Sequence, residues 1–414
     1  MVIAFICLLI IPSLILSAAE CSQVNSDIMS DSTVGTDPLK PLRLLKEKKY
    51  AELEALLGNL QDAYKKDFTK EKIYEDTLDA FTSQNSEHEK YFNDWVSKRP
   101  DSPFSFLARA IYFLLAGDTR RGDKWASDTT EENFQGMRDY YDKAISDVKQ
   151  VMLKDPNIIK SYTVLIHIAR ADGRFSDEFK KEQLDKALKI NPYSYSVRAA
   201  YIASIEPQWG GSIEKMQAAI EEAKPFYSKN QRLKSLEGRI ETNRGYQSFY
   251  YDKDKNAALD HFEKAVAYNT TNDTNCWLFQ KRGDLLDSVK KEYKSAMESY
   301  DRAINACPFY LVSRIRRSAL SYRFYDYEKA LKDAEIVIEM DPSQSEPYFI
   351  RGRVYFKKGE YEKALEDMQK AIAIKPKSKR YQDGLQLLLE EMDKNTKKNK
   401  TEEERVKPKE DILQ

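Results

Sequence analysis

The segment EYEKALEDMQKAIAIKP (residues 360–376) decides the fold, because two earlier segments repeat its pattern in the same register. These segments are DYEKALKDAEIVIEMDP (326–342) and EYKSAMESYDRAINACP (292–308). One constant interval separates the equivalent positions, which are Tyr293, Tyr327 and Tyr361, Ala296, Ala330 and Ala364, and Pro308, Pro342 and Pro376. Such a period predicts stacked helical hairpins that share a continuous core.

Small residues stand inside these units where two helices would cross. Gly352 lies on the predicted first helix and Ala364 on the second helix of the last unit. The pattern resembles the tetratricopeptide repeat, an antiparallel helix pair with a period of about 34 residues that crosses closely at such positions. A fourth, degenerate unit precedes the three, with Gly238 on its first helix. Its Ala258 stands more than one period before Ala296, which predicts extra loop residues at this junction.

The preceding half of the chain repeats more loosely. The interval from Ala144 to Pro156 equals the interval from Ala364 to Pro376 in the last unit. Residues 42–227 resemble a bacterial family known only as a domain of unknown function, the 4034 family, through segments such as LLKEKKYAELEALLGNLQDAY (44–64) and PQWGGS (207–212). That resemblance implies a helical architecture and no established activity. We therefore expect an all-α fold, a right-handed superhelical solenoid of antiparallel helix pairs.

The domain organisation follows from these patterns. We expect a signal peptide (1–19), a flexible linker (20–40), a helical domain with degenerate repeats (41–230), tetratricopeptide repeats (231–376), a capping helix (377–392) and a disordered charged tail (393–414).

The first segment, MVIAFICLLIIPSLILSAAE (1–20), is apolar and carries no charge before Glu20. Small residues end it, so we expect cleavage after Ala19 and a periplasmic or secreted protein. An uncleaved membrane anchor is the alternative, since the run is barely long enough to span a bilayer. A lipoprotein signal ending at Cys21 is a third possibility.

Composition and charge restrict the function classes. Hydrophobic residues make up 41% of the 414 residues and charged residues 32%, which suits a folded protein with a substantial core. Lys and Arg together number 67, as do Asp and Glu, so no net positive field attracts nucleic acid.

A search for catalytic motifs finds none. The sequence lacks GxSxG, GxxxxGK[ST], HExxH and GxGxxG patterns, so we predict no enzyme and no cofactor. The segment DKDKNAALDHFE (252–263) spaces its acidic residues like a calcium loop. Ala257 stands where that loop requires glycine, and we therefore predict no metal site.

The segment EPQWGGS (206–212) separates two predicted helices. Pro207 ends the first helix, two glycines permit positive φ, and Ser212 can cap the second helix, so we expect a structural turn. Trp209 would then pack on the neighbouring pair. The alternative is a loop site in which backbone amides hold an anion, formed by Trp209, Gly210, Gly211 and Ser212.

Two of the four cysteines lie in one repeat. Cys276 opens the predicted first helix and Cys307 closes its antiparallel partner, which brings both to the same end of the hairpin. A disulfide can form there in an oxidising compartment, and two free thiols are the alternative.

In the tetratricopeptide family the first helix of each pair lines a concave groove. The resemblance places these residues there: Trp277, Gln280, Asp284, Asp287, Ile315, Tyr322, Arg323, Phe349, Arg353, Phe356 and Lys357. Aromatic anchors beside charged side chains suit an extended peptide or a partner helix. The alternative is that several of these side chains only pack between repeats.

These observations favour an exported, non-catalytic scaffold of the bacterial envelope that binds a protein or peptide. We expect no nucleic-acid partner, and membrane contact only if the N-terminal segment is uncleaved. One alternative is a ligand-binding or enzymatic module in residues 41–230 that uses the PQWGGS loop. Another is a membrane-anchored assembly factor.

Overall fold

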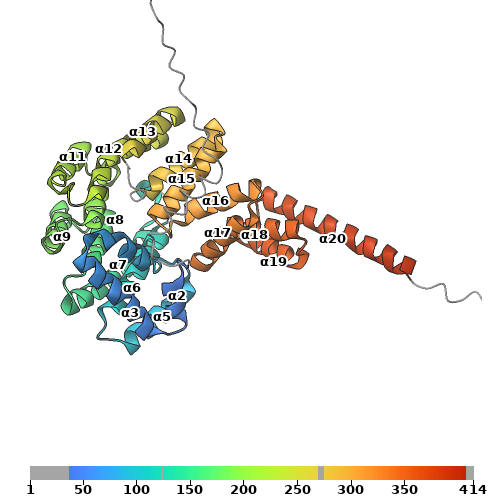
Figure 1. Ribbon diagram of the computed structural model, residues 1–414, viewed down its shortest axis with the longest axis horizontal. Helices are drawn as coiled ribbons and strands as arrows, with labels where there is room; N and C mark the ends of the chain where they lie inside the picture. Colours follow the sequence, from blue (N-terminus) through green and yellow to red (C-terminus); the bar gives the residue numbers. More distant parts are fainter. Residues whose placement is uncertain (1–36, 123–124, 269–274, 407–414) are drawn as a thin grey trace, which may run out of the picture. The chain divides into compact units, whose positions relative to one another are not determined.

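The computed structural model describes residues 37–122, 125–268 and 275–406 (Figure 1). The predicted signal peptide and most of the predicted linker lie outside these residues. Within the described ranges the chain forms helices and turns and no strand, so the predicted all-α class is confirmed. No helix among them is long and apolar enough to cross a membrane.

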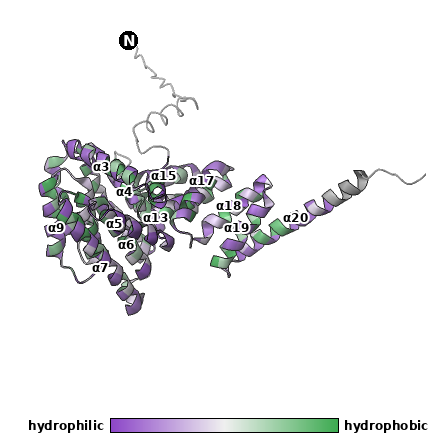
Figure 2. Ribbon diagram, turned by 90° about the horizontal axis from the view of Figure 1, so that it is seen from below, coloured by the Kyte–Doolittle hydropathy of each residue, from purple (hydrophilic) through white to green (hydrophobic). Residues whose placement is uncertain are grey.

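Helices joined by short turns make up most of the described chain. In chain order they are α2 (Lys40–Lys46), α3 (Tyr50–Lys66), α4 (Glu71–Asp79), α5 (Glu89–Lys98), α6 (Pro103–Arg121), α7 (Glu131–Lys154), α8 (Ile159–Ala171), α9 (Asp177–Ile190), α10 (Tyr195–Ser204), α11 (Ile213–Glu221), α12 (Gly238–Gln247), α13 (Lys255–Tyr268), α14 (Cys276–Leu285), α15 (Tyr293–Ala306), α16 (Leu311–Arg323), α17 (Tyr327–Met340), α18 (Ser345–Lys358), α19 (Tyr361–Ile374) and α20 (Lys379–Val406). Polar and apolar residues alternate around them in Figure 2, as amphipathic helices require.

Consecutive helices pack as antiparallel pairs, and small residues set how closely they cross. In the pair α18–α19, a Cβ added to Gly352 would lie 3.1 Å from Met368 Cγ and 3.2 Å from the Ala364 carbonyl oxygen. In the pair α14–α15, a Cβ on Gly283 would lie 2.6 Å from the ring of Tyr300. The predicted solenoid of helix pairs is therefore confirmed, and the α18–α19 crossing lies at Gly352 and Ala364, as the repeat pattern indicated.

The first helices of two pairs end in a π-helical turn. These turns are Ser248–Asp252 after α12 and Leu286–Lys290 after α14. The turn after α14 adds one residue, because the interval from Gly283 to Ala296 is longer by one than the equivalent interval from Gly352 to Ala364. Part of the excess at the junction before Ala296 is therefore taken up within a helix end and not in a loop.

Helix α17 returns to the beginning of the fold. The backbone N–H of Gln84 donates to the Met340 carbonyl over 2.9 Å, and Ser83 Oγ donates to the same oxygen over 3.1 Å. Lys46 Nζ lies 2.7 Å from Glu339 Oε1, and His88 Nε2 lies 3.3 Å from that atom. We call this contact the seam.

Apolar packing accompanies the seam. Phe309, Ile336 and Met340 belong to the same core cluster as Leu42 and Phe92. The described residues from Leu39 onward form one compact unit. The predicted boundary between residues 230 and 231 therefore does not separate two cores.

The C-terminal helix is longer than the sequence predicted. Helix α20 continues to Val406, so part of the segment 393–414, predicted to be disordered, is helical. Ion pairs along one side support this continuation, with Lys397 Nζ 2.6 Å from Asp393 Oδ2. Asn395 also donates to Tyr361 Oη over 2.7 Å and ties the helix to α19.

Candidate functional site

Helices α14, α16 and α18 are the first helices of three consecutive pairs and carry the residues predicted to line the groove. Two of those residues are buried, so the prediction is wrong for them. Phe349 is 2% exposed, and its ring packs 4.6 Å from Tyr381, on the helix that follows the pair. Gln280 is 1% exposed and donates to Asp284.

Trp277 is half-buried within an aromatic cluster. Its ring lies 5.7 Å from Phe262 in an edge contact, 5.5 Å from Tyr246 and 6.4 Å from Tyr250. The cluster continues to Trp125, whose ring is 6.1 Å from that of Tyr250. Trp277 therefore packs between repeats, which is the alternative that the sequence left open.

The predicted acidic groove residues form ion pairs with a neighbouring first helix. Asp284 accepts a hydrogen bond from Tyr300 Oη at 3.0 Å and lies 3.2 Å from Arg316 Nε. Asp287 accepts from Arg323 Nη1 at 2.9 Å. These carboxylates connect α14 to α16 and set the position of the arginines.

An aromatic residue followed by a cation repeats on the last two first helices. Tyr322 and Arg323 end α16, and Phe356 and Lys357 stand exactly one repeat later on α18. Arg353 joins the two, because its guanidinium lies 4.2 Å from the Tyr322 ring centroid. We call these five residues the exposed strip, although only Arg323 and Lys357 are exposed and Tyr322, Arg353 and Phe356 are half-buried. Ile315, also predicted for the groove, is partly buried on the same helix as Tyr322.

Sequence reasoning missed two aromatic residues beside the exposed strip. Phe324 is 51% exposed and Tyr325 is 77% exposed, in the turn between α16 and α17. Tyr325 has a φ of 63°, and Gly359 occupies the same position one repeat later with a φ of 77°. The alignment of Tyr325 with Gly359 of the next repeat was the signal in the sequence that could have identified this exposed turn.

The PQWGGS segment is a turn in which the Gly210 and Gly211 amides are already bonded. The Gly210 N–H donates to the Pro207 carbonyl at 3.1 Å, and the Gly211 N–H donates to the Glu206 carbonyl at 3.2 Å. Ser212 Oγ accepts from the Lys215 N–H at 3.2 Å and caps α11. Two of the three amides that the alternative anion site would use are therefore already paired within the turn.

Trp209 packs on the neighbouring helix pair, as the structural interpretation expected. The Arg170 guanidinium of α8 lies 5.0 Å from its ring centroid. Beside it, Gln208 Oε1 accepts a hydrogen bond from Asn243 of α12 at 2.9 Å. The turn thus connects α8 to α12.

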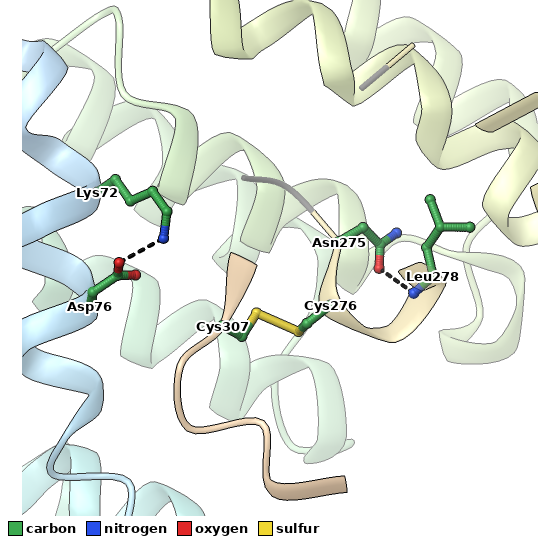
Figure 3. The surroundings of a disulfide bond; sticks show 6 residues. All are labelled: Lys72, Asp76, Asn275, Cys276, Leu278 and Cys307. Atoms are coloured by element: carbon green, nitrogen blue, oxygen red, sulfur yellow. Dashed lines mark hydrogen bonds and ion pairs between the residues drawn. A yellow bond between two sulfur atoms is a disulfide. The ribbon is translucent and has the colours of Figure 1, made fainter. Parts of the chain in front are cut away.

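Cys276 and Cys307 are joined in a disulfide, one of the two states that the sequence left open (Figure 3). The bond links the start of α14 to the residue that follows α15. Asn275 caps α14 next to it, with Oδ1 accepting from the Leu278 N–H at 3.0 Å. The disulfide therefore joins the two ends of the α14–α15 hairpin that lie opposite its turn.

The described residues contain no group of three or more His, Cys, Asp or Glu side chains that could hold a metal ion. In the segment that resembled a calcium loop, Asp254 accepts from the Asn256 and Ala257 amides at 3.0 and 2.9 Å. These bonds start α13, so that carboxylate acts as a helix cap.

Comparison with known proteins supports the repeat assignment. Residues 345–378, which include α18 and α19, match the tetratricopeptide repeat family. No curated protein matches the chain. The matched residues lie outside 42–227, so the resemblance to the domain of unknown function stays a prediction.

Similar solved structures are tetratricopeptide and related proteins. YrrB, described as a tetratricopeptide protein with an unusual peptide-binding site, is 21% identical over 48% of this chain and 96% of its own, with a TM-score of 0.32. A tetratricopeptide protein from Parabacteroides merdae is 16% identical over 61% and 93%, with a TM-score of 0.29. Yeast Tom70 is 12% identical over 91% and 79%, with a TM-score of 0.36. At these scores no partner or activity follows from the likeness. The chain is a helical repeat protein that carries a tetratricopeptide repeat at residues 345–378.

Proposed function

We propose that this protein is an exported, non-catalytic scaffold of the bacterial envelope that binds a protein or peptide segment along the exposed strip. The observation that carries the proposal is the repetition of Tyr322–Arg323 as Phe356–Lys357 on successive first helices. Each of these two-residue segments places an aromatic ring and a cation at equivalent positions of consecutive repeats. An extended segment that crosses α16 and α18 would meet both pairs in turn.

The surroundings hold these side chains in place. Arg353 is stacked between the rings of Tyr322 and Phe349, 4.2 and 5.7 Å from their centroids. Arg323 is fixed by Asp287 and lies 4.7 Å from the ring of Tyr293. Side chains that are ordered before binding lose less conformational entropy when a partner docks. The two arginines of the strip therefore suit recognition better than flexible surface side chains would.

Site-specific crosslinking tests the binding surface. A photo-crosslinking residue at Phe356 should capture a discrete partner from envelope extract, and the same residue at exposed Lys370 of α19 should not. Substitution of Tyr322 and Lys357 by alanine should abolish the capture at Phe356. Equal capture from both positions, or capture unaffected by the alanine variant, would contradict the proposed strip.

Export is tested separately by fractionation and mass spectrometry. A soluble envelope species that begins at Glu20 would support cleavage after Ala19. An intact chain in the membrane fraction would favour the anchored alternative. An unprocessed cytoplasmic chain would overturn the proposed export and leave the binding strip unaffected.

A further inference from the structure

Arg170 on α8 is a partly buried arginine whose hydrogen-bonding capacity is unused. Among the described residues it makes no hydrogen bond and no ion pair, and its Nε is enclosed without a partner. It packs instead on Trp209, whose ring centroid lies 5.0 Å from the guanidinium carbon. A guanidinium carries five N–H donors, of which the Nε donor of Arg170 is the buried one, and buried donors are nearly always satisfied in folded proteins.

Two carboxylates near Arg170 have other partners. Asp118 of α6 accepts a hydrogen bond from Tyr141. Glu206 accepts from Gln208 Nε2 at 2.6 Å and lies 3.7 Å from Arg239 Nη1. Arg170 still acts on both through its charge, since burial raises the pKa of each carboxyl group and Arg170 opposes that rise. The guanidinium therefore lies near two carboxylates without contacting either.

A neutral histidine and a second arginine also lie close to this position. Burial lowers the pKa of His167, one turn before Arg170, well below its usual value, and the charges of Arg170, Lys160 and Arg239 lower it further. Lys160 is neutralised by Glu75 and Asp79, at 2.5 and 3.0 Å. Arg170 and Arg239, which lies 3.7 Å from Glu206, are the remaining two of these cations, and the imidazole stays neutral next to them.

We propose that Arg170 anchors an oxyanion-binding site between α8, the Glu206–Trp209 turn and α12, which takes a small carboxylate or phosphate. The Trp209 ring packs 5.0 Å from the guanidinium carbon, and a guanidinium stacked in this way can still donate from its edge in a fork-shaped contact. Arg239 adds a second cation, and the Asn243–Gln208 hydrogen bond fixes the turn that carries Trp209. The site goes beyond the proposed scaffold function, because none of its residues belongs to the exposed strip.

Titration calorimetry of the full-length chain with inorganic phosphate and, separately, with glutarate at constant ionic strength tests the site. We expect saturable binding of at least one probe. In Arg170→Gln the dissociation constant for that probe should rise about 10-fold or more, as the loss of a charge-assisted hydrogen bond implies. Arg244→Gln, which removes an exposed arginine of α12, is the matched control and should bind as the unaltered protein does.

The two probes identify the source of the oxyanion. Binding of phosphate alone supports a phosphate site, and binding of glutarate alone supports a carboxylate site, provided that Arg170→Gln weakens it. Absence of saturable binding with both probes, or equal affinity in Arg170→Gln, overturns the proposal.

A second measurement avoids dependence on a folded variant. Phenylglyoxal, an arginine-selective reagent, should modify Arg170 in the unaltered chain, and a saturating concentration of the bound probe should protect it. Peptide mass spectrometry reports this modification position by position. Unchanged modification of Arg170 in the presence of the probe would overturn the proposal as well.

Discussion

Two adjacent glycines in the PQWGGS turn are required for different reasons. Gly210 has a φ of 83° and open space around the position of a Cβ, so its requirement is conformational. Gly211 has no positive φ, but a Cβ there would overlap the carbonyl group of Ile205. Its requirement is steric and involves backbone atoms that cannot rotate away.

These glycines give the first prediction. Gly211→Ala should lower the free energy of unfolding by about 3 kcal/mol, because the overlap forces the turn open. Gly210→Ala should cost about 1 kcal/mol, the usual penalty for a left-handed residue with a Cβ. Urea titration of both variants measures the difference, and an equal cost would contradict the steric explanation.

Tyr325 gives the second prediction. It holds a left-handed conformation with its ring 77% exposed, so it keeps a strained backbone with little packing in return. Tyr325→Gly should raise the free energy of unfolding by about 0.5–1 kcal/mol. The equivalent Gly359→Ala should lower it by a similar amount. A destabilised Tyr325→Gly would mean that its ring contributes more to folding than its exposure indicates.

At the scale of single residues, the sequence predicted the structural role of a side chain better than it predicted which neighbours cover that side chain. The cap at Ser212 and the packing of Trp209 followed from residue type and position. The burial of Gln280 and Phe349 did not, because helical spacing alone does not show which neighbour covers a side chain. The sequence could not predict that the Nε donor of Arg170 lacks a partner, since this depends on residues far away in the sequence.

At the level of elements, the repeat period correctly predicted the helix pairs from α14 to α19. The period also predicted where the paired helices cross, because alanine and glycine recur where the backbones approach each other. The sequence also showed that the junction before Ala296 was longer, but assigned the excess to a loop. Part of it is the π-helical turn Leu286–Lys290, which periodicity cannot distinguish from an ordinary helix end.

The disulfide gives a prediction about the α14–α15 pair. It joins cysteines with a sequence separation of 31. Reduction should therefore lower the free energy of unfolding by about 2–4 kcal/mol through the greater freedom of the unfolded chain. Urea titration with and without reductant measures this loss. A double variant, Cys276→Ser with Cys307→Ser, should match the reduced protein and ignore the reductant, and sensitivity in that variant would point to another thiol.

At the scale of the whole molecule, the seam is the feature that repeat counting did not predict. Repeats stack on their neighbours, so a sequence period indicates local contacts only. Lys46 and Glu339 meet across a sequence separation of 293. Their pairing depends on the accumulated turn of every intervening pair, which no local pattern encodes.

The seam gives a prediction about pH. Hydrogen bonds from His88 and Lys46, against the effect of burial, lower the pKa of Glu339 to about 2. Because the folded pKa is lower than the unfolded one, this stabilisation is present above the unfolded value of about 4.3 and is lost as the pH falls towards the folded pKa. The side chain is 33% exposed, so screening limits the effect to about 1 kcal/mol.

Glu339→Gln isolates this contribution. The variant should be less stable than the unaltered chain at about pH 6, and the difference should shrink as the pH is lowered from about 4.5 to about 2. Urea titrations at several pH values measure it. A difference that stays constant over this range would show that the carboxylate does not stabilise the seam by its charge.

The seam also changes how the protein would carry a mechanical load. An open solenoid stretches like a spring, each helix pair yielding a little under tension. Here the bonds from Ser83 and Gln84 to Met340 connect the two ends of the intervening helices directly. If a tensile force were applied between α2 and α20, these few bonds would bear it first. The helices from α5 to α16 would carry little of the force until the seam breaks.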